Sequence, residues 1–133
     1  MIVVDASAAL DLLLQKPTAK ALELRVFAVG EELHAPHLID LEVVQALRRH
    51  VKAGQMSSER ARQSLEAWVV FPVARHVHDL LLPRIWELRD SITAYDAAYV
   101  ALAEALDATL LTTDARLARS HGHRAKIETI GLE

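Results

Sequence analysis

The most constraining feature of this sequence is an alternation of short apolar runs with longer stretches of helical periodicity. The first run, Ile2 to Val4, is β-branched, as expected for a buried strand. Further strands are predicted at residues 33–35, 71–73, 109–112 and 127–130. Because helices separate the strands, the order predicts an α/β fold with a parallel sheet, right-handed crossovers and helices on both faces. In such a sheet, ligands bind beyond the carboxyl ends of the strands.

Helical patterns occupy the intervals between the strands. Their expected bounds are residues 6–14, 17–29, 37–53, 57–70, 77–88 and 93–106, with a short helix from Asp114. Gly54 marks the end of the third helix. Pro17 suits the first turn of the second helix, whereas Pro83 is expected to kink or break the fifth.

The length of the chain and its lack of cysteine narrow the class of protein. Its 133 residues fit one domain, residues 1–133, that is large enough for a real core. Having no cysteine excludes disulfides, thiolate zinc sites and a cysteine nucleophile, and it fits a reducing cytoplasm. The N-terminus lacks a positive leader region and is interrupted by Asp5 and Asp11. We therefore expect neither a signal peptide nor a membrane span, and a cytoplasmic location.

The net charge does not decide whether nucleic acid is a partner. A formal charge of -3 argues against one when it is taken alone. Setting aside four carboxylates that metal ions would hold turns that -3 into +1. Many of the basic residues are arginines, which suit phosphate.

Two acidic residues close predicted strands. Asp5 ends the run IVVD, and Asp114 ends TLLTTD. Because the carboxyl ends of parallel strands lie at one edge of a sheet, the two side chains are expected to face one cleft. Each residue alone is equally explained as the N-cap of the helix that follows. Together at one edge, they favour a metal site.

Two further acids occupy helix positions that suit a cleft. Asp96 interrupts TAYDAAYVALAEAL, which is apolar almost all round and therefore predicts a buried helix; Thr93 and Asp96 also fit a capping box. Glu42 falls at the border of the apolar arc of HLIDLEVVQALRRH. Asp40 is its rival, since it lies in the first turn of that helix, where the helix dipole favours a carboxylate. The helical wheel does not choose between Glu42 and Asp40.

Such a set of acids has a specific chemical use. Hard divalent cations such as Mg²⁺ and Mn²⁺ prefer oxygen ligands, and they relieve the repulsion among carboxylates gathered in a cleft. A bound metal ion lowers the pKa of its water and stabilises charge on a phosphodiester. The residues therefore indicate phosphodiester hydrolysis by metal-activated water.

The whole chain resembles the PIN-domain family, and within it the VapC toxins of toxin–antitoxin pairs. The motifs that carry the resemblance are IVVDASAAL, LEVVQALRR, TAYDAAYVALAEAL and ATLLTTDARL, in this order. The resemblance implies a three-layer α/β/α sandwich with a mostly parallel, about five-stranded sheet, and a Mg²⁺- or Mn²⁺-dependent endoribonuclease. It also implies a homodimer and a cognate VapB-like antitoxin that obstructs the cleft.

The resemblance assigns roles to particular residues. The catalytic, metal-holding acids would be Asp5, Glu42 rather than Asp40, Asp96 and Asp114. Thr112 and Ser7 match hydroxyl residues of the family pattern, and they would support a water or a carboxylate.

Basic and aromatic side chains have two interpretations each. Arg89, Arg116 and Arg49 are the candidate RNA contacts, against the alternative of a solvated surface. Tyr95 and Tyr99 are expected to lie in the core with their hydroxyls hydrogen-bonded, although a base-stacking platform is the alternative. Trp68 and Trp86 are expected to take part in core packing or in an interface.

Other classes of site and function were weighed. The pairs His76/His78 and His121/His123 raise a zinc site, but surface histidines are the preferred interpretation. The chain has 4 glycines and none before Gly30, which excludes a P-loop and a dinucleotide fingerprint after the first strand. The remaining alternatives are a non-catalytic PIN-fold binding or dimerisation module and a nuclease that acts on DNA.

Overall fold

The computed structural model describes residues 1–131, and it forms an α/β fold with the sheet between helices. Residues 132–133 of the predicted domain lie outside the described residues. The strands are β1 (Ile2–Val4), β2 (Leu33–Pro36), β3 (Val73–His76), β4 (Thr109–Thr112) and β5 (Ile127–Thr129). They lie in the order β3-β2-β1-β4-β5, and every neighbouring pair is parallel, which confirms the predicted sheet.

The central position of β1 determines which residues meet at the edge of the sheet. β1 pairs with β2 on one side and β4 on the other, with Ile2 opposite both Leu33 and Thr109. All three residues of β1 are buried, as its β-branched run predicted. The carboxyl ends of β1 and β4 therefore lie side by side, although β4 enters the chain more than 100 positions later.

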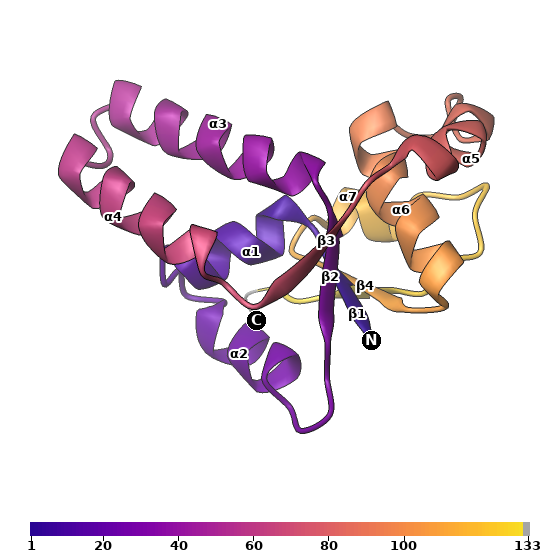
Figure 1. The fold of residues 1–133 in the computed structure, drawn as a ribbon, viewed down its shortest axis with the longest axis horizontal. Helices are drawn as coiled ribbons and strands as arrows, with labels where there is room; N and C mark the ends of the chain where they lie inside the picture. The colour runs from indigo at the N-terminus through magenta and orange to yellow at the C-terminus, as the bar shows by residue number, and fades with distance from the viewer. Residues whose placement is uncertain (132–133) are drawn as a thin grey trace.

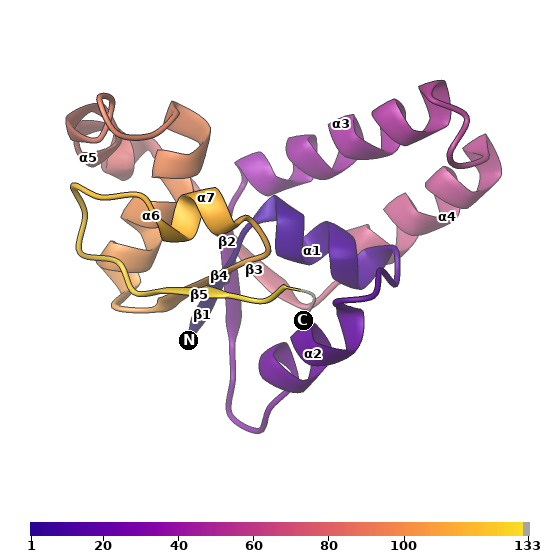
Figure 2. The same cartoon turned by 180° about the vertical axis from the view of Figure 1, so that it is seen from behind.

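Helices cover both faces of the sheet (Figures 1 and 2). One face carries the first four helices: α1 (Ala6–Leu13), α2 (Ala19–Val26), α3 (Leu38–Lys52) and α4 (Ser58–Val69). The hairpin of α3 and α4 extends away from the sheet. The other face carries α5 (Leu82–Glu87) and α6 (Ala94–Leu106), and the short α7 (Ala115–Ala118) follows β4. This is the three-layer arrangement that the sequence predicted.

The core is continuous through β1, β4 and α6. Every residue from Ala97 to Ala103 is buried, which accounts for the almost uniform apolar character of α6. The small alanines of α6 let this helix lie close to the sheet, so that Asp96 in its first turn is held at the sheet edge. None of the helices in residues 1–131 is long and apolar enough to cross a membrane.

Prolines account for the main differences between expected and observed bounds. The strand expected at residues 71–73 begins instead at Val73, because Pro72 has no N–H for the ladder. The helix expected at residues 77–88 is divided into a 3-10 turn, η1 (Asp79–Leu81), and α5. The break expected near Pro83 falls between η1 and α5, and Pro83 itself lies in the first turn of α5, where a missing N–H leaves no bond unmade.

Smaller corrections concern helix and strand ends. The helix expected at residues 17–29 covers only Ala19–Val26, because Pro17 precedes the cap residue and does not begin the helix. The strand expected to reach residue 130 ends at Thr129.

Candidate active site

A cavity of about 620 Å³ opens at the carboxyl edge of the sheet, and the predicted acids line it. Each comes from a different part of the fold: the end of β1, the first half of α3, the first turn of α6 and the residue before α7. They are Asp5, Glu42, Asp96 and Asp114. Four carboxylates distributed along the whole sequence are thus brought around one space.

Asp5 is the most enclosed of the four, with 6% of its surface exposed. Its Oδ1 accepts hydrogen bonds from the Ser7 hydroxyl at 2.6 Å and from the Ala8 N–H at 3.0 Å. Its Oδ2 accepts one from the Thr112 hydroxyl. Burial raises the pKa of Asp5, and these hydrogen bonds act in the opposite direction. Asp5 is therefore both the N-cap of α1 and a wall of the cavity.

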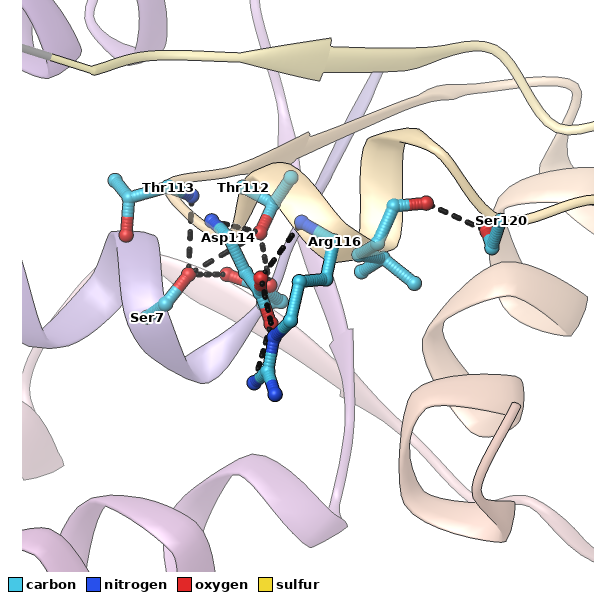
Figure 3. Close-up of polar contacts among 8 residues, drawn as sticks. Ser7, Thr112, Thr113, Asp114, Arg116 and Ser120 are labelled. Atoms are coloured by element: carbon cyan, nitrogen blue, oxygen red, sulfur yellow. Dashed lines mark hydrogen bonds and ion pairs between the residues drawn. The ribbon is translucent and has the colours of Figure 1, made fainter.

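The hydroxyls of Ser7 and Thr112 join α1 to β4 beneath the acids (Figure 3). They lie 3.2 Å apart. The Ser7 oxygen accepts from the Thr113 N–H at 3.0 Å, and the Thr112 oxygen accepts from the Asp114 N–H at 2.9 Å. One network therefore fixes the Asp5 carboxylate and the backbone of Asp114 together.

Glu42 is held by a tyrosine that the sequence had not connected with it. The Tyr99 hydroxyl donates to Glu42 Oε1 at 2.6 Å, and the Tyr99 side chain is otherwise enclosed in the core. Burial raises the pKa of Glu42, and the negative charges of Asp96 and Asp5 raise it further. Tyr99 lies three positions after Asp96 on α6, and that spacing places both side chains toward the same cavity.

Asp40, the rival of Glu42, faces away from this cavity. It accepts hydrogen bonds from Arg75 Nε at 2.8 Å and from Trp68 Nε1 at 2.8 Å. Trp68 is 2% exposed, so Asp40 satisfies a buried indole N–H between α3 and α4.

Asp96 and Asp114 both line the cavity, and their pKa values shift in opposite directions. Partial burial and the charge of Asp114 raise the pKa of Asp96. Partial burial also acts to raise the pKa of Asp114, but Arg116 outweighs it and the net shift is downward. Arg116 donates to Asp114 from its backbone N–H at 2.9 Å, and its side-chain Nε lies 3.3 Å away (Figure 3).

The donor set is chemically suited to a hard divalent cation. It consists of carboxylate and hydroxyl oxygens, and three of the acids have raised pKa values because they are buried near one another. Within residues 1–131, no three His, Asp or Glu side chains are already arranged as a metal cage. The carboxylate oxygens accept hydrogen bonds from Ser7, Thr112, Tyr99 and Arg116 instead. Metal coordination would therefore require some of the carboxylates to rotate.

The predicted basic residues lie around the acids. Arg49 and Arg116 line the same cavity as the acids, and Arg116 has 85% of its side chain exposed. Arg89 lines an adjoining cavity, and its guanidinium lies over the Trp86 ring at 4.4 Å. Trp86 is 66% exposed and so does not belong to the core.

The tyrosine and histidine pairs divide. Tyr99 is buried as expected, but Tyr95 is 63% exposed and lines the acid cavity, so the expectation of a core position was wrong for Tyr95. His76 Nε2 lies 2.8 Å from His34 Nδ1 on the neighbouring strand, a pairing that the sequence spacing of His76 and His78 did not suggest. His123 contacts Ser120, at 2.8 Å.

Comparison with known proteins identifies relatives for most of the chain. Residues 2–121 match the model of the PIN domain. Ribonuclease VapC9 of Mycobacterium tuberculosis is 45% identical over 117 residues, covering 88% of each chain. Ribonuclease VapC12 of the same species is 42% identical over 130 residues, covering 98% of this chain and 99% of its own length.

Solved structures share the fold at much lower sequence identity. The VapBC2 complex of Rickettsia felis, bound to a DNA fragment from its promoter, aligns with a TM-score of 0.72 at 15% identity over 98% of this chain and 99% of that chain. VapC20 of Mycobacterium tuberculosis, described as a sarcin–ricin loop cleaving toxin, aligns with a TM-score of 0.69 at 15% identity over 93% of this chain and 97% of its own. The chain therefore belongs to the PIN-domain family, in the group that includes the VapC ribonucleases.

Proposed function

We propose that this protein is a Mg²⁺- or Mn²⁺-dependent endoribonuclease and the toxin of a toxin–antitoxin pair. The observation that carries the proposal is the meeting of Asp5, Glu42, Asp96 and Asp114 around one cavity in a PIN fold. The VapC ribonucleases that resemble the chain over nearly its full length support RNA as the substrate.

The four acids would hold one or two metal ions, which supply a water of lowered pKa and stabilise charge on the phosphodiester. Asp5 is the fixed member, because Ser7 and Thr112 hold both of its oxygens in place. Glu42 is oriented through one oxygen by Tyr99, which leaves its other oxygen free to turn toward the cavity. Asp114 would have to exchange the Arg116 guanidinium for a metal ion.

The partners follow from the same proposal. A VapB-like antitoxin would obstruct the cavity, and the structural likeness to VapBC complexes supports such a partner. We also propose a homodimer, a cytoplasmic location and a single domain over residues 1–133. Specificity for a particular RNA would come from the shape of the cavity and from the basic surface around it.

The test compares the wild type with Asp5→Asn and Asp96→Asn, both in cells without an antitoxin and as purified proteins with RNA and Mn²⁺. We expect growth arrest and RNA cleavage by the wild type only, and no cleavage after chelation. Asp40→Asn is the matched control, because it removes a carboxylate from the same helix as Glu42 but outside the cavity.

Other outcomes would contradict specific parts of the proposal. Cleavage that persists in chelator would exclude the metal mechanism. Cleavage of single-stranded DNA in preference to RNA would assign the site to a DNA nuclease, and no cleavage of either polymer would indicate a non-catalytic PIN module.

A further inference from the structure

The acid cavity adjoins a second one of similar size. This second cavity, of about 620 Å³, shares Asp96, Asp114 and Arg116 with the first. Asp96 and Asp114 therefore lie at the junction of the two cavities, and a bound polymer strand can extend to either side of them. The two sides differ in chemistry, and this difference has a consequence for how a strand is held.

The second cavity is lined by donors suited to phosphate. Its walls come from the segment between α5 and α6 and from α7 with the residues after it. Once Asp96 and Asp114 are assigned to metal, three arginines face the single carboxylate of Asp90; these arginines are Arg89, Arg116 and Arg119. Ser91, Thr93 and Ser120 also line this cavity, together with Ile92, Leu117 and His121. The Thr93 hydroxyl oxygen accepts from the Asp96 N–H, and the Ser120 hydroxyl donates to the Leu117 carbonyl. Arginine and hydroxyl donors of this kind bind phosphate oxygens without reading base identity.

Arg89 is already positioned for such a contact. Its guanidinium carbon lies 4.4 Å from the centre of the Trp86 ring, and its Nη1 donates to the Trp86 carbonyl at 3.0 Å. An arginine held in one orientation loses less side-chain entropy when a ligand binds. The exposed Trp86 therefore has a role that core packing does not supply.

The first cavity presents apolar and aromatic surface beyond its acids. Tyr95 is 63% exposed, Leu41 is 71% exposed, and Leu38 lies beside them. Exposed aromatic rings in a groove are platforms on which unpaired bases stack. Tyr95 and Asp96 line the same cavity, so a base stacked on Tyr95 would lie near the phosphate that the acids address.

We infer that a single RNA strand passes over the four acids and is bound by different kinds of contact on its two sides. Arg89 and Arg119 bind the phosphate backbone in the second cavity, and Tyr95 stacks a base in the first. This inference rests on the proposed function, and it specifies an unpaired strand as the bound form of the substrate.

The backbone hold is tested by the salt dependence of binding. The probe is fluorescein-labelled oligouridylate, and its anisotropy is measured in chelator with proteins carrying Asp96→Asn, which prevents cleavage and removes one negative charge. Each phosphate contact on a single strand contributes about 0.7 to the slope of log affinity against log salt. We expect Arg89→Ala and Arg119→Ala each to reduce the slope by about 0.7. Arg89→Lys should retain the slope, because it keeps the charge.

Arg48→Ala is the matched control for these variants. Arg48 is an exposed arginine on α3 that lines neither cavity, and its loss changes the net charge by the same amount. An equal reduction of the slope by Arg48→Ala would show that only total charge matters and would overturn the inference. Unchanged slopes for Arg89→Ala and Arg119→Ala would overturn it as well.

The base hold is tested with Tyr95→Ala and Tyr95→Phe. Loss of one stacking contact weakens binding by about 5- to 150-fold, and we expect this for Tyr95→Ala with little change in the salt slope. Tyr95→Phe should bind like the parent. An abasic residue moved along the probe should abolish the Tyr95→Ala effect at one position; an effect that is equal at every position would refute stacking.

Failure of this inference differs from failure of the proposed function. Wild-type protein that cleaves RNA with Mn²⁺, together with variants that leave slope and stacking unchanged, would overturn only the strand path. Wild-type protein that neither cleaves nor binds RNA would overturn both.

Discussion

Replacing Thr112 by valine tests whether the network beneath the acids stabilises a buried charge. Thr112 is completely buried, and its hydroxyl both donates to Asp5 and accepts from the Asp114 N–H. Valine has the same shape, so the change removes hydrogen bonds without opening a cavity. Losing a bond to a charged group costs about 1.5–3 kcal/mol, and leaving an N–H unpaired costs about 1–3 kcal/mol. Since Asp114 is partly exposed, water recovers part of this, and we expect a total loss of about 2–4 kcal/mol.

The loss should depend on pH in a defined direction. Burial raises the pKa of Asp5 in the folded state, so the folded protein holds that proton more tightly than the unfolded chain. The free energy of unfolding therefore decreases as pH rises from the usual aspartate range through the raised pKa. Thr112→Val removes a donor to the carboxylate and raises this pKa further. The deficit of the variant should be smaller in acid and larger near neutral pH.

Urea denaturation of metal-free protein at several pH values measures both effects. Thr113→Val is the matched control, because Thr113 is the adjacent threonine and only its backbone N–H takes part in the network. A loss no larger than that of Thr113→Val would refute the assigned strength of the network. A deficit that does not shrink in acid would show that Asp5 is not the group being stabilised.

Four other substitutions have outcomes that follow from individual contacts or charges. Asp96→Asn should raise the melting temperature of metal-free protein, because it removes a negative charge that raises the pKa values of Asp5 and Glu42. The same substitution should abolish stabilisation by Mn²⁺, and an unchanged response to Mn²⁺ in thermal melts would contradict the site. Asp40→Asn should lower the free energy of unfolding by on the order of 1 kcal/mol in urea denaturation and retain nuclease activity. Glu42→Gln should lose nuclease activity and remain folded. The reverse pattern in an RNA cleavage assay would exchange the roles of the two residues. Glu104→Gln should lower the free energy of unfolding by about 2–4 kcal/mol, because the buried Glu104 carboxylate accepts from Arg84 at 2.8 Å. Its contacts with Arg84 and Arg124 outweigh the effect of burial and lower the pKa of Glu104, so this stabilisation should be lost as pH falls through the glutamate range. A loss that is independent of pH in urea denaturation would contradict the charge assignment.

The sheet edge could be predicted from the sequence because local pattern and topology agree there. Asp5 and Asp114 each follow a short apolar run, and parallel pairing of those runs places both at one edge without knowledge of any side-chain contact. The fold was predictable for the same reason: the alternation of strands and helices leaves few arrangements of a parallel sheet.

Contacts between distant residues decided what the sequence left open. The helical wheel does not choose between Glu42 and Asp40, and their roles are distinguished because Tyr99 contacts Glu42 while Arg75 and Trp68 contact Asp40. These partners lie 28 to 57 positions away, beyond the reach of helical periodicity. The exposure of Tyr95 was missed for a similar reason, because the apolar surroundings of α6 in sequence do not show which turn of the helix reaches the cavity.

The pairing of β1 with β4 also determines when the acidic site can form during synthesis of the chain. Asp5 leaves the ribosome well before the hydroxyl that holds it, which belongs to Thr112, 107 positions later. A nascent or truncated chain that ends before β4 lacks Thr112, Asp114 and the strand beside β1. The carboxylates can therefore assemble only after β4 and Asp114 have been translated, so a product interrupted before β4 carries no complete site.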